Sequence, residues 1–162
     1  MSRLTPSIAV DRFAMTPGHS SSNDYIHVVA ALIWQPNSSN SFLISKRQKG
    51  KHLEGLWEFP GGKMESGETP VQALRRELRE ELDIIALKVD PYQQVLHHYP
   101  DRSILLDVWE VKSFQGSLEA REGQELKWVA VDQLTRYRFP DADLPVLETI
   151  VSSAFAKTGR LP

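Results

Sequence analysis

The sequence predicts one α/β sandwich domain, in which helices cover a sheet of mixed strands. Short runs rich in β-branched and aromatic residues alternate with turn residues, beginning with residues 25–34 (YIHVVAALIW). A glycine turn at 61–62 leads into an amphipathic helix that is expected to end at about Leu82, and a closing helix is expected over 143–156. Each of these elements has an apolar face to bury, so the combination predicts helices packed on a sheet.

The predicted strands are separated by residues that favour turns. Residues 25–34 and 41–46 (SFLISK) predict the first two strands, and the intervening PNSSN predicts that they pair as an antiparallel hairpin. A basic loop at 47–50 and the segment 53–59 then lead to the glycine turn. After the first helix we expect strands near 85–97 and 103–112 around a turn at 99–102, a short strand at 117–118, a strand at 127–131 and a short helix starting at 131.

The first 24 residues differ from the rest of the chain. They contain scattered Ser, Thr, Pro and Gly without a sustained apolar period. Asp11 and Arg12 interrupt the longest apolar stretch, so the segment lacks the core of a signal peptide. We therefore expect residues 1–24 to be a flexible extension and residues 25–162 to be the folded domain.

Composition excludes several classes of function. The net charge is −2, from 19 basic and 21 acidic residues, so there is no basic field for a nucleic-acid polymer. Without cysteine the chain has no disulfide, no zinc–thiolate site and no thiol nucleophile. No run of about 18 apolar residues predicts a membrane span. These features favour a cytoplasmic protein and leave open whether it is a monomer or a dimer.

The helix after the glycine turn carries three carboxylates on one face. An advance of about 100° per residue places Glu80 about 60° to one side of Glu77 and Glu81 about 40° to the other. The apolar residues form a neighbouring stripe: Val71, Leu74, Leu78 and Leu82. Thr69 is expected as N-cap and Pro70 as the first helical residue.

Such a carboxylate face predicts a divalent metal site. Three close carboxylates repel one another unless a cation lies among them, and oxygen ligands suit Mg²⁺, with Mn²⁺ as a substitute. The alternative is a solvated helix with ion pairs between residues four apart. Segregation of acidic and basic residues onto different faces, after a glycine turn, favours the metal site.

Residues 62–84 resemble the Nudix box, a pattern with eight positions that match in register. They are Gly62, Glu68, Arg76, Glu77, Leu78, Glu80, Glu81 and Ile84. The chain departs from the pattern at Asp83, where the family usually has a glycine that ends the helix in a left-handed conformation. Asp tolerates that conformation better than most residues do. The resemblance implies the Nudix fold, a mixed sheet between helices, over about residues 25–157.

Four segments outside the box are similar to those of MutT-type members of the family: residues 42–47, 99–102, 119–124 and 139–146. The resemblance implies Mg²⁺-dependent hydrolysis of oxidised nucleoside triphosphates such as 8-oxo-dGTP. The products are a monophosphate and pyrophosphate, and the activity limits mutation during DNA replication and supports DNA repair. Alternatives are a pyrophosphohydrolase for CTP or 5-substituted dCTP, hydrolysis of dinucleoside polyphosphates or ADP-ribose, and a nucleotide-binding module without turnover.

The resemblance also implies a metal and catalytic set. The metal ligands would be the carbonyl of Gly62 and the carboxylates of Glu77, Glu80, Glu81 and Glu122. Glu77 is expected to act as ligand or general base, with Glu122 as the rival base. Arg76 is expected to orient Glu77 or another carboxylate.

The residues expected to bind substrate are Arg47, His52, Glu58, Phe59, Lys63, Arg102 and Asp143. Each has a structural alternative: Phe59 as core, Arg47 and Arg102 in surface ion pairs, Lys63 as a solvated lysine. Asp143 stands where MutT-type enzymes usually have Asn, which both donates and accepts, whereas an ionised Asp only accepts. Asp143 therefore either reads the base or caps the last helix.

Overall fold

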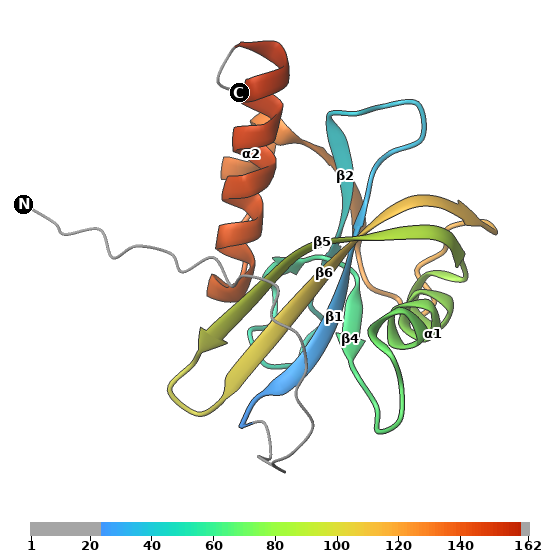
Figure 1. Cartoon of the computed structure of the whole chain (residues 1–162), viewed down its shortest axis with the longest axis vertical. Helices are drawn as coiled ribbons and strands as arrows, with labels where there is room; N and C mark the ends of the chain where they lie inside the picture. The colour runs from blue at the N-terminus through green and yellow to red at the C-terminus, as the bar shows by residue number, and fades with distance from the viewer. Residues whose placement is uncertain (1–23, 160–162) are drawn as a thin grey trace, which may run out of the picture.

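The computed structural model describes residues 24–159 (Figure 1). The predicted flexible extension at 1–24 lies, apart from Asp24, outside the described residues. The helices are α1 (Pro70–Leu82) and α2 (Leu144–Thr158), with short 3-10 turns η1 (Val131–Arg136) and η2 (Asp141–Asp143). The strands are β1 (Ile26–Ile33), β2 (Ser41–Lys46), β3 (Trp57–Glu58), β4 (Gly61–Lys63), β5 (Ile85–His98), β6 (Ser103–Gln115) and β7 (Leu126–Ala130). Within the described residues, no helix combines the length and apolar character that crossing a bilayer requires.

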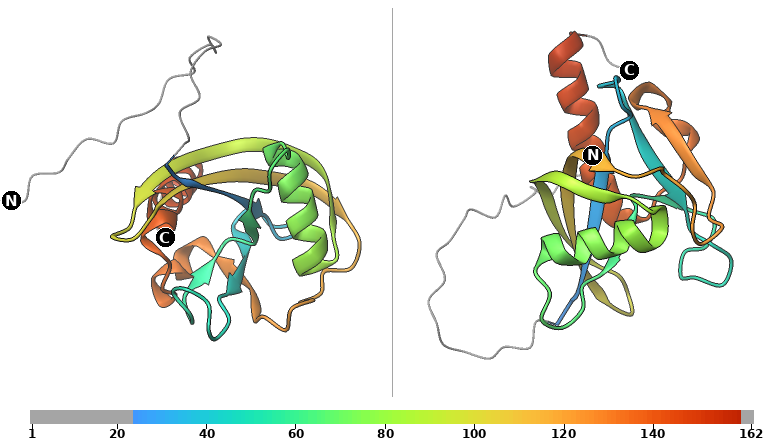
Figure 2. Two further views of the ribbon diagram at one scale, coloured as in Figure 1. Left: turned by 90° about the horizontal axis from the view of Figure 1, so that it is seen from below. Right: turned by 90° about the vertical axis from the view of Figure 1, so that its right-hand side faces the viewer.

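The strands form two sheets, with the orders β4-β1-β6-β5 and β3-β2-β7. The first sheet is mixed, because β1 runs parallel to β6 while the other pairs are antiparallel. In the right-hand view of Figure 2, β2 (teal) and β7 (orange) run beside each other, away from the β5–β6 pair. The mixed sheet with helices on its faces confirms the predicted fold class.

The predicted hairpin between the first two strands is wrong. Both edges of β1 are already occupied, one by β4 and the other by β6 along its whole length. The two strands meet only where Trp34 bridges Phe42 and the Gln35 N–H donates to the Ser41 carbonyl over 2.8 Å. Beyond that point they separate into different sheets, and β2 pairs with β3 and β7 instead.

The short strand predicted at 117–118 is also wrong. β6 ends at Gln115, and the chain after Gly116 is irregular. The N–H groups of Glu119 and Arg121 donate to the carbonyls of Leu82 and Glu81, each over 3.0 Å. This segment therefore satisfies its backbone at the end of α1 rather than in a sheet, which places the following loop beside the carboxylates of that helix.

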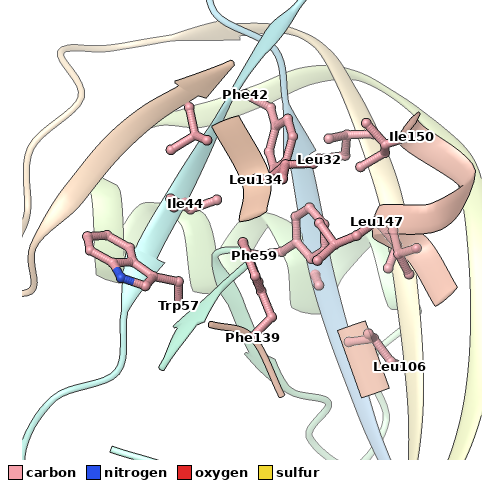
Figure 3. Packing of buried hydrophobic residues seen from close by; sticks show 14 of the residues in the cluster. Leu32, Phe42, Ile44, Trp57, Phe59, Leu106, Leu134, Phe139, Leu147 and Ile150 are labelled. Carbon is pink, nitrogen blue, oxygen red and sulfur yellow. The ribbon is translucent and has the colours of Figure 1, made fainter. Parts of the chain in front are cut away.

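Two apolar clusters lie on the two faces of β1. Val29, Ala31 and Ile33 pack with the buried residues of α1, whereas Ala30 and Leu32 pack with those of α2. Figure 3 shows the second cluster, in which aromatic residues of β2, the β3–β4 connection and the segment before η2 meet the α2 side chains. The continuous apolar run of the first strand is thus explained by burial on both faces.

Helix α1 begins and ends as the sequence predicts. Thr69 and Gln72 form a capping box: the Gln72 N–H donates to Thr69 Oγ1 over 3.3 Å, and the Thr69 N–H donates to Gln72 Oε1 over 2.8 Å. Pro70 occupies the first turn. Asp83 ends the helix in the left-handed conformation, with φ of 57°, so it takes the conformation usual for the family glycine. Its carboxylate pairs with Arg121 over 3.0 Å.

The left-handed conformation at Asp83 predicts a difference between two variants. Asp83→Gly and Asp83→Ala both remove the ion pair with Arg121, but only Ala has a Cβ that opposes positive φ. We expect Asp83→Ala to be less stable than Asp83→Gly by about 1 kcal/mol in urea unfolding. Equal stabilities would contradict this account of the helix end.

Candidate active site

A cavity of about 540 Å³ brings together most of the predicted site residues. Its wall is built by one end of β1, the β3–β4 segment, α1, the loop after β2, the turn between β5 and β6, the 119–125 loop and η2. The predicted residues that line it are Arg47, His52, Glu58, Phe59, Gly62, Lys63, Glu77, Glu81, Arg102, Glu122 and Asp143. Glu80 and Arg76 are outside this wall.

The glycine turn lets α1 approach the sheet closely. A Cβ on Gly61, whose φ is 155°, would lie 2.0 Å from the carbonyl oxygen of Val29 on β1. A Cβ on Gly62 would lie 2.4 to 2.5 Å from the carboxylate atoms of Glu77. Either side chain would force backbone or helix to move, so the absence of Cβ atoms is what places the Glu77 carboxylate against β4.

Arg76 joins the carboxylates of α1 to the loop before it. Its guanidinium donates from Nε and Nη2 to the two carboxylate oxygens of Glu68 over 2.7 and 3.0 Å, and from Nη1 to Glu77 over 2.7 Å. These hydrogen bonds lower the pKa of Glu68 to about 2. Nη1 also lies 3.5 Å from Glu80, whose side chain is 57% exposed. Arg76 thus binds Glu77, which lines the cavity, and lies near Glu80, which does not.

At the acidic end of the cavity, burial and neighbouring carboxylates disfavour the ionised form of two glutamates. Burial raises the pKa of Glu81 to about 8, and the carboxylates of Glu122, Glu58 and Glu77 add to the rise. A hydrogen bond of 3.2 Å from the Gly61 N–H opposes it. Burial also raises the pKa of Glu77, in spite of Arg76. A divalent cation would stabilise the ionised forms of these neighbouring carboxylates and offset their mutual repulsion. The oxygen ligands available here therefore fit such an ion.

The ligands are not yet gathered around one point. Among residues 24–159, no three acidic, histidine or cysteine side chains are already arranged as a metal site. Arg76 accounts for part of this, because it is bound to both Glu77 and Glu80. Of the predicted ligand carboxylates, Glu77, Glu81 and Glu122 reach the cavity and Glu80 does not.

The opposite end of the cavity contains a second buried polar group. The Arg47 guanidinium pairs with Glu58 and donates from Nε to the His52 carbonyl over 2.7 Å. Asp143 is 5% exposed, and burial, reinforced by Glu58, raises its pKa well above the ordinary value. Asp143 precedes α2 but makes no side-chain capping hydrogen bond. The capping alternative is therefore wrong, and its carboxyl group is available to a ligand.

The structural alternatives for the other residues hold in part. Phe59 stacks on Phe42 at 5.7 Å and is 3% exposed, so it belongs to the core while one edge lines the cavity. Arg102 forms an ion pair with Asp101 over 2.6 Å.

Two further residues of the wall with polar side chains, Lys51 and Tyr99, are not among the predicted site residues. Tyr99 packs edge-on against His52 with ring centroids 6.0 Å apart, and its hydroxyl accepts from the Ala142 N–H over 3.2 Å. Tyr99 lies in the 99–102 turn, which is similar to that of MutT-type enzymes, and this similarity could have identified it as a residue of the cavity wall.

An acidic helix face lies against a glycine turn, with Lys and Arg side chains across the same cavity, and this combination is chemically suited to a divalent metal ion and a phosphorylated substrate. The chain belongs to the Nudix family: the family model for the NUDIX domain matches residues 29–149. Hydrolases of this family generally need a divalent metal ion.

Relatives of known activity are similar over most of the chain. The 8-oxo-dGTP diphosphatase of Escherichia coli is 38% identical over 111 residues, which are 68% of this chain and 86% of that protein. The CTP pyrophosphohydrolase of E. coli is 38% identical over 132 residues, which are 82% of this chain and 96% of that protein. The solution structure of the E. coli ORF135 protein superposes with a TM-score of 0.72 at 37% identity, covering 88% of this chain and all of that one.

The raised pKa of Asp143 predicts how stability depends on pH. The folded protein keeps a proton that the unfolded chain releases, so stability falls as pH rises above the ordinary range of Asp toward the raised value. The loss is about 1.4 kcal/mol for each pH unit between the two values. Asp143→Asn removes this dependence, which urea unfolding between pH 4 and 8 measures. The exposed Asp141→Asn is the control, and equal slopes in wild type and Asp143→Asn would refute the assignment.

Proposed function

We propose that the chain hydrolyses nucleoside triphosphates at an internal phosphorus, releasing a nucleoside monophosphate and pyrophosphate. The observation that carries the proposal is the cluster of crowded carboxylates, Glu77, Glu81 and Glu122, beside Gly62 and Lys63. It lies in the same cavity as a separate polar group suited to a nucleobase. The preferred substrates are oxidised nucleotides such as 8-oxo-dGTP, on which a relative of 38% identity acts.

The metal ion is proposed to be Mg²⁺, with Mn²⁺ as a substitute. Glu77, Glu81, Glu122 and the Gly62 carbonyl would hold it, and Glu80 would assist from the rim after separating from Arg76. When bound, the metal ion neutralises phosphate charge and lowers the pKa of water. Lys63, the next residue on β4, supplies a positive charge at this end of the cavity for the phosphate chain.

Proton transfer from water is assigned to Glu77, with Glu122 as the alternative base. Arg76 fixes one oxygen of Glu77 through Nη1, which leaves the other oxygen for the water or the metal. A base must be ionised and correctly oriented, and the Arg76 contact serves both needs, because a cation favours the charged form. Glu68 in turn holds Arg76 through two hydrogen bonds.

The nucleobase of the substrate is assigned to the end of the cavity formed by Phe59, Asp143 and Arg47. Burial raises the pKa of Asp143 and so favours its protonated form, in which the carboxyl group donates one hydrogen bond and accepts another. A protonated Asp thereby replaces both functions of the usual Asn. The same donor and acceptor pair suits a cytosine-type base, and a CTP pyrophosphohydrolase is 38% identical, so CTP or 5-substituted dCTP is the second candidate substrate.

Glu77→Gln tests the catalytic assignment. The substitution keeps the shape but removes the charge, and we expect kcat to fall at least about 100-fold, the range of a lost general base or ligand. The assay is Mg²⁺-dependent pyrophosphate release from 8-oxo-dGTP, dGTP, CTP and 5-substituted dCTP. Glu148→Gln, on the exposed side of α2, is the matched control.

Two outcomes would contradict the proposal. One is the absence of pyrophosphate from every triphosphate, which would favour a binding module without turnover. The other is faster hydrolysis of ADP-ribose than of any triphosphate in the panel.

Asp143→Asn tests whether residue 143 recognises the nucleobase. The amide retains one donor and one acceptor but can no longer lose its proton. We expect the base selectivity of Asp143→Asn to be independent of pH, whereas in the wild type kcat/KM for the preferred base falls with rising pH as Asp143 ionises. Identical pH profiles of selectivity in the two proteins would remove Asp143 from the base site.

A further inference from the structure

Glu122 is held by two side chains of the loop that follows β2. Gln48 donates from Nε2 to the backbone carbonyl of Glu122, and Lys51 Nζ lies 3.5 Å from Glu122 Oε2. The two contacts reach the backbone and the carboxylate of the same residue, more than 70 positions away in the chain. The position of Glu122 therefore depends on the loop that also carries Arg47 and His52.

Lys51 acts on two carboxylates of the cavity wall, Glu122 and Glu58. It lines the same wall as Glu77, Glu81 and Glu122. Burial raises the pKa of Glu58, and the charges of Arg47 and then Lys51 partly offset that rise, so Lys51 also acts on this carboxyl group. With the Lys51 side chain 51% exposed and that of Glu122 41% exposed, the ion pair is open to solvent and can exchange.

The carboxylates of the acidic end differ in their partners. Glu77 is bound to Arg76 and Glu122 to Lys51, whereas Glu81 receives a backbone N–H. A divalent ion held by Glu122 would repel the ammonium group of Lys51 at this distance. The flexible lysine stem would allow the ammonium to leave while the loop stays in place.

We propose that Lys51 is the counter-ion of Glu122 until the metal ion binds, and that it then contacts the phosphate chain of the nucleotide. The inference rests on the proposed function, since it takes the metal and the triphosphate as ligands of this cavity. Once released, the Lys51 ammonium remains in a cavity that already holds the substrate, and a compact ammonium is a good phosphate partner. Lys51 is thus a positioning residue for Glu122 and a binding residue for phosphate.

Lys49 provides a matched comparison on the same loop. It lines a separate, more open depression of about 680 Å³ together with Lys46, Gly55 and Glu125, and it is outside the cavity wall described above. Removal of either lysine changes the net charge equally. A general electrostatic effect would therefore appear in both variants, and a specific exchange with Glu122 only in Lys51→Ala.

The first measurement is Mn²⁺ binding without nucleotide, by electron paramagnetic resonance or calorimetry. Loss of the competing ammonium in Lys51→Ala should tighten Mn²⁺ binding about two- to fivefold, the range of an exposed ion pair. Lys49→Ala should bind Mn²⁺ as the wild type does. An equal affinity in all three proteins, or equal tightening in both variants, overturns the exchange at Glu122.

The second measurement is binding of a non-hydrolysable triphosphate, an α,β-methylene nucleotide, at saturating Mg²⁺. Lys51→Ala should weaken binding about tenfold, as expected for loss of a charged hydrogen bond, and Lys51→Arg should restore most of the affinity. Unchanged binding in Lys51→Ala overturns the phosphate contact. Neither measurement needs turnover, so a chain without pyrophosphate release would contradict the proposed function and leave this test intact.

Discussion

The close approach of α1 to β4 is the constraint on which the site depends. Two consecutive glycines allow the backbone to lie against β1 on one side and against the Glu77 carboxylate on the other. Any Cβ at these positions would lie within 3 Å of other atoms and would push the helix outward. The carboxylates would then be solvated like those of an ordinary surface helix. Their burial, and the resulting rise in pKa of Glu77 and Glu81, follows from this contact.

The central strand β1 explains how distant segments reach one cavity. Because β1 pairs with β4 on one edge and β6 on the other, it joins the glycine turn and the strand that follows the 99–102 turn in one sheet. Its two faces bury separate apolar clusters, one under α1 and one under α2. The acidic end of the cavity, where the metal ion is proposed to bind, is thereby supported by the cluster under α1, and the Asp143 end by the cluster under α2. Changes in α2 packing can affect base recognition without moving the carboxylates of α1.

Burial raises the pKa of carboxyl groups at both ends of the cavity, with different consequences at each end. At both ends burial disfavours ionised carboxyl groups. At the acidic end, a divalent ion can restore the charge of several neighbouring carboxylates at once. At the other end a single Asp143 can remain protonated and donate a hydrogen bond. Two arginines oppose this rise in pKa at the carboxylates they bind. Arg76 binds Glu68 and Glu77, and Arg47 binds Glu58. Arginine suits both places because its guanidinium binds a carboxylate through two nitrogens or two carboxylates together.

The sequence by itself determined the local elements: the capped helix over Pro70–Leu82, the carboxylates near one face, and the strands whose apolar runs mark them as buried. These depend on neighbours within a few residues, and the left-handed end at Asp83 is of the same kind. Strand pairing could not be derived in this way, because a hairpin between residues 25–34 and 41–46 is locally reasonable and is prevented only by β4 and β6. The tertiary structure likewise decided that Asp143 is buried near Glu58 and Arg47, and that Lys51 reaches Glu122. Each of these depends on which charged groups become neighbours when segments far apart in the chain are packed together, and spacing along the sequence does not contain that information.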